Sequence, residues 1–127
     1  MPKHIKKLLE RNALLIAIIT TILVAYLSLR ESGVGIKIPI ENIDKVFHFT
    51  AYFFLTTTWL FALRNKKATI KMVLLLILYG ILLEYAQEWF TKNRTKDVFD
   101  VLANTSGIIF ATLVYKYIYN KFAKIFA

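Results

Sequence analysis

The feature that most constrains this chain is a set of four stretches without Lys, Arg, Asp or Glu. They cover residues 13–29, 46–63, 72–83 and 101–115. At about 1.5 Å per helical residue, the first two reach roughly 26 Å, close to the hydrocarbon thickness of a bilayer. Apolar residues form 57% of the chain, against roughly 45–50% in soluble domains. We therefore expect residues 1–127 to form one all-α integral membrane domain, a bundle of four transmembrane helices.

The third and fourth stretches are too short to cross a bilayer by themselves. To reach the required length, the third must continue through Glu84 towards Phe90, and the fourth must include Asp100. Ionisable side chains at membrane depth are costly and usually have a function. These two positions are therefore the first indication of a functional site.

The distribution of basic residues predicts the orientation of the bundle. With four spans, both termini and the loop at 64–71 lie on one side and carry 11 Lys and Arg, against 6 on the other side. Cytoplasmic loops collect such residues, so both termini are expected in the cytoplasm (N-in/C-in) and the protein in the cytoplasmic, inner membrane. This distribution explains the net charge of +9 and argues against nucleic acid as a partner.

Polar side chains recur at helical spacing where the second span begins, the third ends and the fourth begins. Because these three ends share the predicted outer side, and each charge near the bilayer centre costs roughly 2.5–3.5 kcal/mol, the side chains should face one another. The rows are Asp44, His48 and Tyr52 on the second helix, Glu84, Gln87 and Glu88 on the third, and Asp97, Asp100 and Asn104 on the fourth.

The predicted cluster has an excess of negative charge. Its five carboxylates meet only two basic residues, Lys45 and Arg94, which leaves −3. Two outcomes remain open, because either some carboxylates are protonated or a cation balances the charge.

Three motifs in this region resemble those of the VanZ-like family. Residues 44–52 (DKVFHFTAY) resemble D-K-x-x-H-F-x-x-Y, residues 84–87 (EYAQ) resemble E-x-x-Q, and residues 94–107 (RTKDVFDVLANTSG) resemble R-x-x-D-x-x-D-x-x-A-N-x-x-G. The resemblance implies a small multi-span membrane protein, in a family named for resistance to teicoplanin, a lipid-tailed glycopeptide antibiotic. The signature positions that it implies are Asp44, Lys45, His48, Tyr52, Glu84, Gln87, Arg94, Asp97, Asp100, Asn104 and Gly107.

The first functional hypothesis is a binding pocket of a bacterial cell-envelope protein. Its ligand would be a lipid headgroup or an amphipathic envelope molecule such as a lipoglycopeptide antibiotic, bordered on its apolar part by Phe49, Phe53 and Trp89. The expected ligand-binding residues are Asp44, Lys45, Tyr52, Gln87, Glu88, Arg94, Asp97 and Asn104.

Three other interpretations stay open. An intramembrane hydrolase or transferase acting on a lipid-linked envelope substrate would use His48, Glu84 and Asp100 as catalytic residues. A small subunit of a larger membrane complex would use the cluster to dock a membrane-protein partner. In a purely structural cluster, Lys45 and Arg94 neutralise carboxylates, and Asn104 and Gln87 form hydrogen bonds across helices.

Metal and cofactor sites are not expected from sequence patterns. The chain has no Cys, no short metal-binding spacing such as H-E-x-x-H, and no nucleotide-binding glycine motif. Membrane lipids are the expected partners. Gly107 and Ala111 are expected at a close helix contact.

Overall fold

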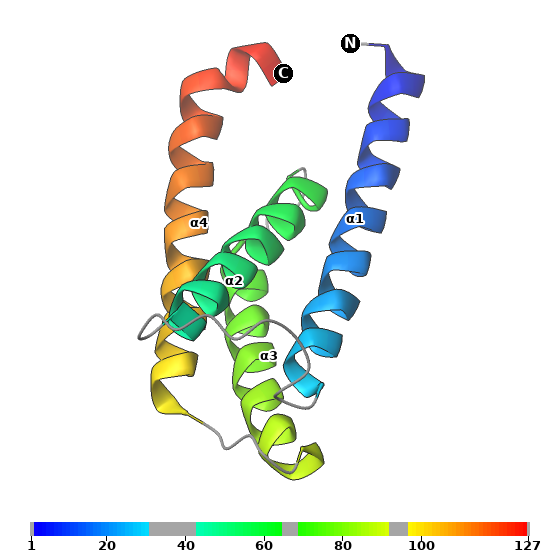
Figure 1. Ribbon diagram of the computed structural model, residues 1–127. Helices are drawn as coiled ribbons and strands as arrows, with labels where there is room; N and C mark the ends of the chain where they lie inside the picture. Colours follow the sequence, from blue (N-terminus) through cyan, green and yellow to red (C-terminus); the bar gives the residue numbers. More distant parts are fainter. Residues whose placement is uncertain (1, 31–42, 65–68, 92–96, 127) are drawn as a thin grey trace.

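The computed structural model describes residues 2–30, 43–64, 69–91 and 97–126, and within these ranges the chain is almost entirely helical (Figure 1). The sequence-based prediction of four helices and an all-α fold is confirmed for the described ranges. The helices are α1 (Lys3–Leu29), α2 (Ile43–Ala62), α3 (Thr69–Phe90) and α4 (Val98–Phe126).

The helices alternate in direction, so both chain termini lie at the same end of the bundle (Figure 1). At the opposite end, here called the site end, α1 and α3 finish and α2 and α4 begin. Helix α2 crosses the bundle obliquely and packs mainly against α4 and α1. The site end thus gathers the polar helix ends that the sequence predicts to converge.

Three described helical segments are long and apolar enough to cross a membrane, namely Lys3–Leu29, Thr69–Phe90 and Val98–Lys121. Helix α2 is not among them, and it carries Asp44, Lys45 and His48 near its start and three consecutive threonines further on. Length and composition therefore support three of the four expected membrane spans. The N-in/C-in orientation stays a prediction.

The outward faces of the helices are strongly apolar. Ile22 is 64% exposed, Leu74 61% and Leu113 61%, and each has exposed apolar neighbours on its own helix. Contiguous apolar surface of this extent is unfavourable in water and suits contact with lipid chains.

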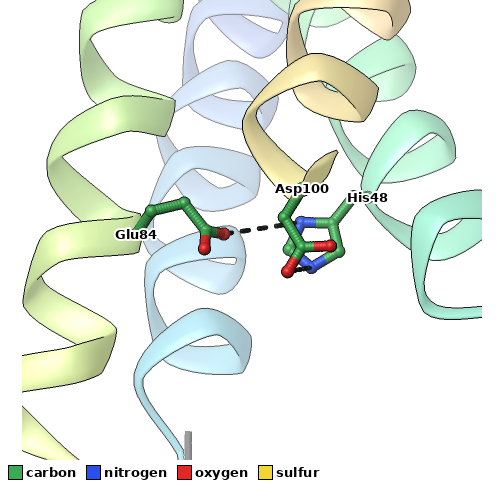
Figure 2. A group of neighbouring side chains, drawn as sticks. All are labelled: His48, Glu84 and Asp100. Carbon is green, nitrogen blue, oxygen red and sulfur yellow. Dashed lines mark ion pairs between the residues drawn. The ribbon is translucent and has the colours of Figure 1, made fainter. Parts of the chain in front are cut away.

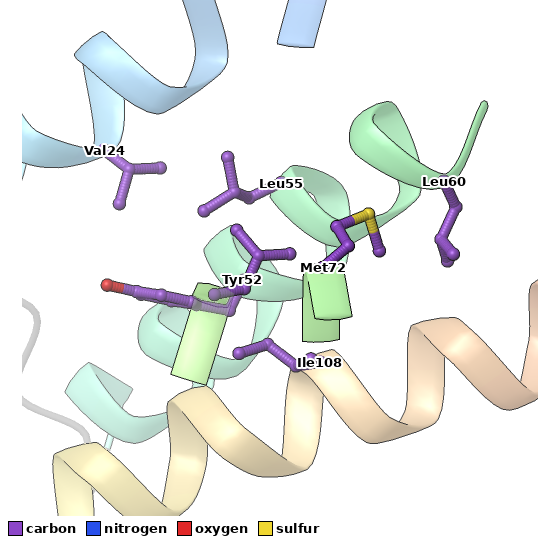
Figure 3. Packing of buried hydrophobic residues seen from close by; sticks show 7 residues of the cluster. Val24, Tyr52, Leu55, Leu60, Met72 and Ile108 are labelled. Atoms are coloured by element: carbon purple, nitrogen blue, oxygen red, sulfur yellow. The ribbon is translucent and has the colours of Figure 1, made fainter. Parts of the chain in front are cut away.

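The interior is built around α2, which is the central helix of the apolar core (Figure 3). Tyr52, Leu55 and Leu60 project from α2 towards residues of the other three helices. The buried apolar cluster comprises Val24, Tyr52, Leu55, Leu60, Met72, Leu76 and Ile108.

Gly107 lies at a contact between α4 and α2 that is too close for any residue with a side chain. A Cβ atom at this position would clash with the Phe49 carbonyl oxygen and lie 3.2 Å from the Phe53 nitrogen. Ala111, one turn further on, is 1% exposed. The expected role of both residues in close packing is confirmed, and the contact brings the first turns of α2 against those of α4.

Candidate functional site

Lys45 is a basic residue at the site end that contacts three carboxylates. Its Nζ lies 2.6 Å from Asp44 Oδ2, 2.8 Å from Asp97 Oδ2 and 2.7 Å from Asp100 Oδ1. The lysine comes from α2, and two of its partners come from the start of α4. Its charge therefore both neutralises carboxylates and joins two helix ends.

Asp97 caps the start of α4. The Phe99 N–H donates to Asp97 Oδ1 at 2.9 Å, which satisfies one of the free amide groups of the first helical turn. The hydrogen bond from Lys45, together with this backbone N–H, holds the pKa of Asp97 below its ordinary value. Asp97 is therefore ionised near neutral pH and holds Lys45 in place.

His48 lies between acidic side chains of two other helices (Figure 2). Its Nε2 is 3.5 Å from Asp100 Oδ2, and its Nδ1 is 3.9 Å from Glu84 Oε1. Nδ1 also lies 2.9 Å from Asn104 Oδ1. An amide oxygen accepts a hydrogen bond, so Nδ1 donates in this contact, and Nε2 faces Asp100.

Tyr52 lies one turn after His48 and is almost fully enclosed. It is 2% exposed, and its hydroxyl has no hydrogen-bond partner among the described residues. A Cβ atom on Gly80 would lie 3.3 Å from the Tyr52 ring, so α3 passes directly over it. Glu84 stands one turn after Gly80 on α3 and is itself buried.

A pocket of about 480 Å³ opens between the end of α1 and the start of α2. One part of its wall is polar and includes His48 and Ser28, and another part is apolar and includes Val24 and Phe47. The lining residues are Val24, Leu27, Ser28, Arg30, Asp44, Phe47, His48, Thr50, Ala51 and Tyr52. Asp44, His48 and Tyr52 all line this pocket from one face of α2, as their helical spacing predicts.

The α1 wall of this pocket was not found by sequence reasoning. Val24, Leu27, Ser28 and Arg30 belong to no motif and carry no unusual spacing. Only the predicted antiparallel arrangement indicates that the end of α1 lies beside the start of α2. Which face of each helix the pocket uses required the tertiary structure.

Other predicted ligand-binding residues occupy different environments. Gln87 is 1% exposed and donates to the Ser28 carbonyl oxygen at 3.0 Å, which ties α3 to α1. Asn104 is 2% exposed and holds His48. Glu88 lies on the exposed side of α3. Arg94 lies outside the described residues.

The aromatic border of the pocket differs from the sequence-based expectation. Phe49 and Phe53 do not line it, since both rings pack against Phe110 of α4 at 5.8 and 5.7 Å between centroids. Trp89 is 78% exposed and is also absent from the lining. Phe47 takes this role, because it lies on the face of α2 that is turned towards α1.

Two groups of described side chains have metal-ligating atoms within 4.8 Å of one another. One group is His48, Glu84 and Asp100, and the other is Asp44, Asp97 and Asp100. Lys45 already bonds all three members of the second group. The first group combines an imidazole with two carboxylates from three different helices.

Apolar helices of spanning length, together with a buried acidic and basic cluster at one end, define a small multi-pass helical membrane protein. Comparison with known families agrees with this class. The model of the VanZ/LLP1 family matches residues 3–120, and the chain belongs to that family. The resemblance of the three motifs is thus confirmed.

A relative is found in Schizosaccharomyces pombe, under the description "Uncharacterized protein C11E3.10". The two sequences are 33% identical over 117 residues, which cover 90% of this chain and 68% of the yeast protein. No solved structure matches the chain.

Proposed function

We propose that the pocket between α1 and α2 binds a membrane amphiphile, with the headgroup at the site end and the acyl chain along α1. The observation that carries this proposal is the division of the pocket wall. Asp44, His48 and Arg30 line it together with Val24 and Leu27. A ligand with a charged head and an apolar tail fits such a wall better than a uniformly polar or apolar one.

The charges of the wall favour a phospholipid headgroup. Arg30 supplies a planar cation suited to a phosphate, and Asp44 and His48 supply groups suited to an amine or hydroxyl. The relative in a yeast favours a headgroup chemistry common to many membranes over a ligand confined to the bacterial envelope, such as a lipoglycopeptide. The proposal places this headgroup at the outer leaflet of a cytoplasmic membrane.

A matched pair of substitutions on α1 tests the proposal. Leu27 lines the pocket and is 42% exposed, whereas Leu15 lies three turns away and is 55% exposed. Filling the pocket with Leu27→Trp should reduce the phospholipid retained per chain by several fold. Leu15→Trp should retain lipid like the natural sequence. Retained lipids are measured by mass spectrometry after detergent exchange, with helicity followed by circular dichroism.

Equal lipid retention by both variants would exclude this pocket as the binding site. Retention of one stoichiometric membrane protein in place of lipid would favour the subunit interpretation.

The arrangement of His48 supports a second candidate function, hydrolysis or group transfer on a lipid-linked substrate. An imidazole whose orientation is fixed by Asn104, with carboxylates on both sides, is an arrangement suited to a general base. His48→Gln should then abolish product formation from lipid pyrophosphates or phospholipids in bilayer discs. Product formed equally by the natural sequence and this variant would exclude His48 as the base, and no product from either supports binding alone.

A further inference from the structure

We infer that His48, Glu84 and Asp100 bind one divalent metal cation of the Zn²⁺ or Mn²⁺ type. This inference reverses the expectation drawn from sequence spacing, and it goes beyond the proposed lipid binding. It stands on the geometry of the cluster and is measured with the metal alone. A failure of lipid binding therefore leaves it testable.

The donor set is chemically suited to such a cation. Imidazole nitrogen and carboxylate oxygen are common ligands of Zn²⁺ and Mn²⁺, and three protein ligands leave positions open for water or a phosphate oxygen. The ligand atoms lie within 4.8 Å of one another, with 3.5 Å between His48 Nε2 and Asp100 Oδ2. A tetrahedral site needs roughly 3.4 Å between ligands, so His48 Nε2 and Asp100 Oδ2 already have this spacing. Glu84 Oε1, which lies 3.9 Å from His48 Nδ1, would have to turn towards them.

Asn104 holds the imidazole in the orientation that a metal ligand requires. Ligating histidines usually donate their second ring N–H to an oxygen, which fixes the tautomer. Here Nδ1 lies 2.9 Å from the Asn104 oxygen, which leaves Nε2 turned towards a carboxylate oxygen of Asp100. A metal ion between Nε2 and this oxygen would have a ligand atom on each side.

The Tyr52 hydroxyl is a second and independent indication. The residue is 98% buried, its hydroxyl has no hydrogen-bond partner among the described residues, and its ring lies against Gly80 beside the Asn104 amide. Buried hydroxyls are rarely left without a partner. A water molecule on the metal, or a carboxylate turned towards the metal, would provide one.

The neighbouring acidic group does not compete for the same ion. Lys45 Nζ lies within 2.6–2.8 Å of Asp44, Asp97 and Asp100, so a cationic group already stands among these three carboxylates. Asp100 has its Oδ1 on Lys45 and its Oδ2 towards His48. Asp100 Oδ2 is therefore the oxygen of this residue that faces His48 and could ligate the metal.

The test uses the full chain, purified in detergent without a histidine tag and treated with chelator. Titration with ZnCl₂ or MnCl₂ in a calorimeter should show one ion per chain, and elemental analysis after desalting should confirm the ratio. His48→Gln and Glu84→Gln should each weaken binding at least tenfold. The matched controls His4→Gln and Glu88→Gln make the same changes on exposed residues and should bind like the natural sequence.

A further measurement does not require disruption of the cluster. In the His4→Gln chain, His48 is the remaining histidine, so pulsed electron paramagnetic resonance of bound Mn²⁺ should show coupling to its imidazole nitrogen. The inference is overturned by absence of stoichiometric binding, by absence of this coupling, or by equal affinity in His48→Gln and its control.

Discussion

Lys45 and His48, three residues apart on α2, divide the acidic side chains of the site end between them. Lys45 bonds Asp44 and Asp97, His48 faces Glu84, and Asp100 contacts both. Asp100 thereby links the electrostatic interactions of the two basic residues. Replacement of one member is expected to disturb the others, since charges in one hydrogen-bonded group are not additive.

The pH dependence of stability should reveal the role of Asp97. Because its pKa in the folded protein lies below the ordinary value of 3.8, its pairing stabilises the fold above that pH and is lost as pH falls through the lowered value. Asp97→Asn should therefore lower Tm at pH 7, and its deficit should shrink below pH 3.8. Thermal unfolding of both chains in detergent between pH 7 and 3 measures this, and a constant deficit would contradict it.

Gly107→Ala should destabilise the contact between α2 and α4. The added methyl group would meet the backbone of Phe49 and Phe53, which cannot move aside as a flexible side chain does. Overpacking of this kind costs about 1–3 kcal/mol. Gly80→Ala is the matched control, because its methyl group would lie 3.3 Å from the Tyr52 ring, and a smaller loss is expected. Free energies of unfolding, measured in mixed micelles, show which of the two variants is less stable. A Gly107→Ala protein with the same free energy of unfolding as the natural sequence would contradict the close contact.

At the scale of elements, α2 contributes both to the polar site and to the centre of the apolar core. One face carries Lys45 and His48 to the site, and the buried residues Leu55 and Leu60 form the core. This double demand explains why α2 is the described helix that does not meet the hydropathy of a membrane span. Packing against the other helices buries two of its polar side chains, Tyr52 and Thr56.

Helix α1 is fixed to its neighbours through Thr21. Its hydroxyl accepts a hydrogen bond from Trp59 Nε1 at 2.8 Å, and its carbonyl oxygen accepts one from the Tyr79 hydroxyl at 2.6 Å. These two bonds tie α1 to α2 and α3 in the middle of the bundle. The α1 wall of the pocket depends on this attachment.

Thr21→Val should remove the bond from Trp59 and leave the bond to the backbone carbonyl intact. Interhelical hydrogen bonds in membranes contribute about 0.6 kcal/mol on average and up to about 1.7, so a loss in this range is expected. Thr20→Val is the control, because the Thr20 hydroxyl bonds within its own helix, to Ile16. Equal unfolding free energies for the two variants would show that the bond between helices contributes nothing.

At the scale of the whole molecule, the number of membrane crossings must agree with the position of the two termini. An even number of crossings places both termini on one side of the membrane, whereas three crossings would separate them. Both termini lie at the same end of the bundle (Figure 1), and the basic residues concentrate at that end. We therefore expect α2 to cross together with its neighbours.

Cysteine accessibility tests this topology directly, since the natural chain contains no Cys. Single variants Lys3→Cys and Lys121→Cys should react with an impermeant maleimide only after the membrane is opened, and Glu88→Cys should react in intact cells. Each position is exposed on the protein. Reaction of Lys3→Cys and Lys121→Cys from opposite sides would contradict the four-crossing arrangement.

Much of the candidate site was predictable because helical spacing is regular. Asp44, His48 and Tyr52 line one pocket as their spacing predicts. Spacing did not distinguish Glu84 from Glu88, which stand on one face of α3. Helix α3 continues past the level at which α2 begins (Figure 1), so Glu84 is covered and Glu88 is exposed.

The sequence by itself determined the class of fold, the helices and the chemical groups that gather at one end, because hydropathy and helical periodicity are local properties. Tertiary structure alone decided that Phe47 and not Phe49 borders the pocket, that α1 forms its second wall, and that Asn104 contacts the His48 ring. These features depend on how each helix is rotated about its axis. That rotation is set by packing contacts between distant residues, such as that of Gly107 with Phe49.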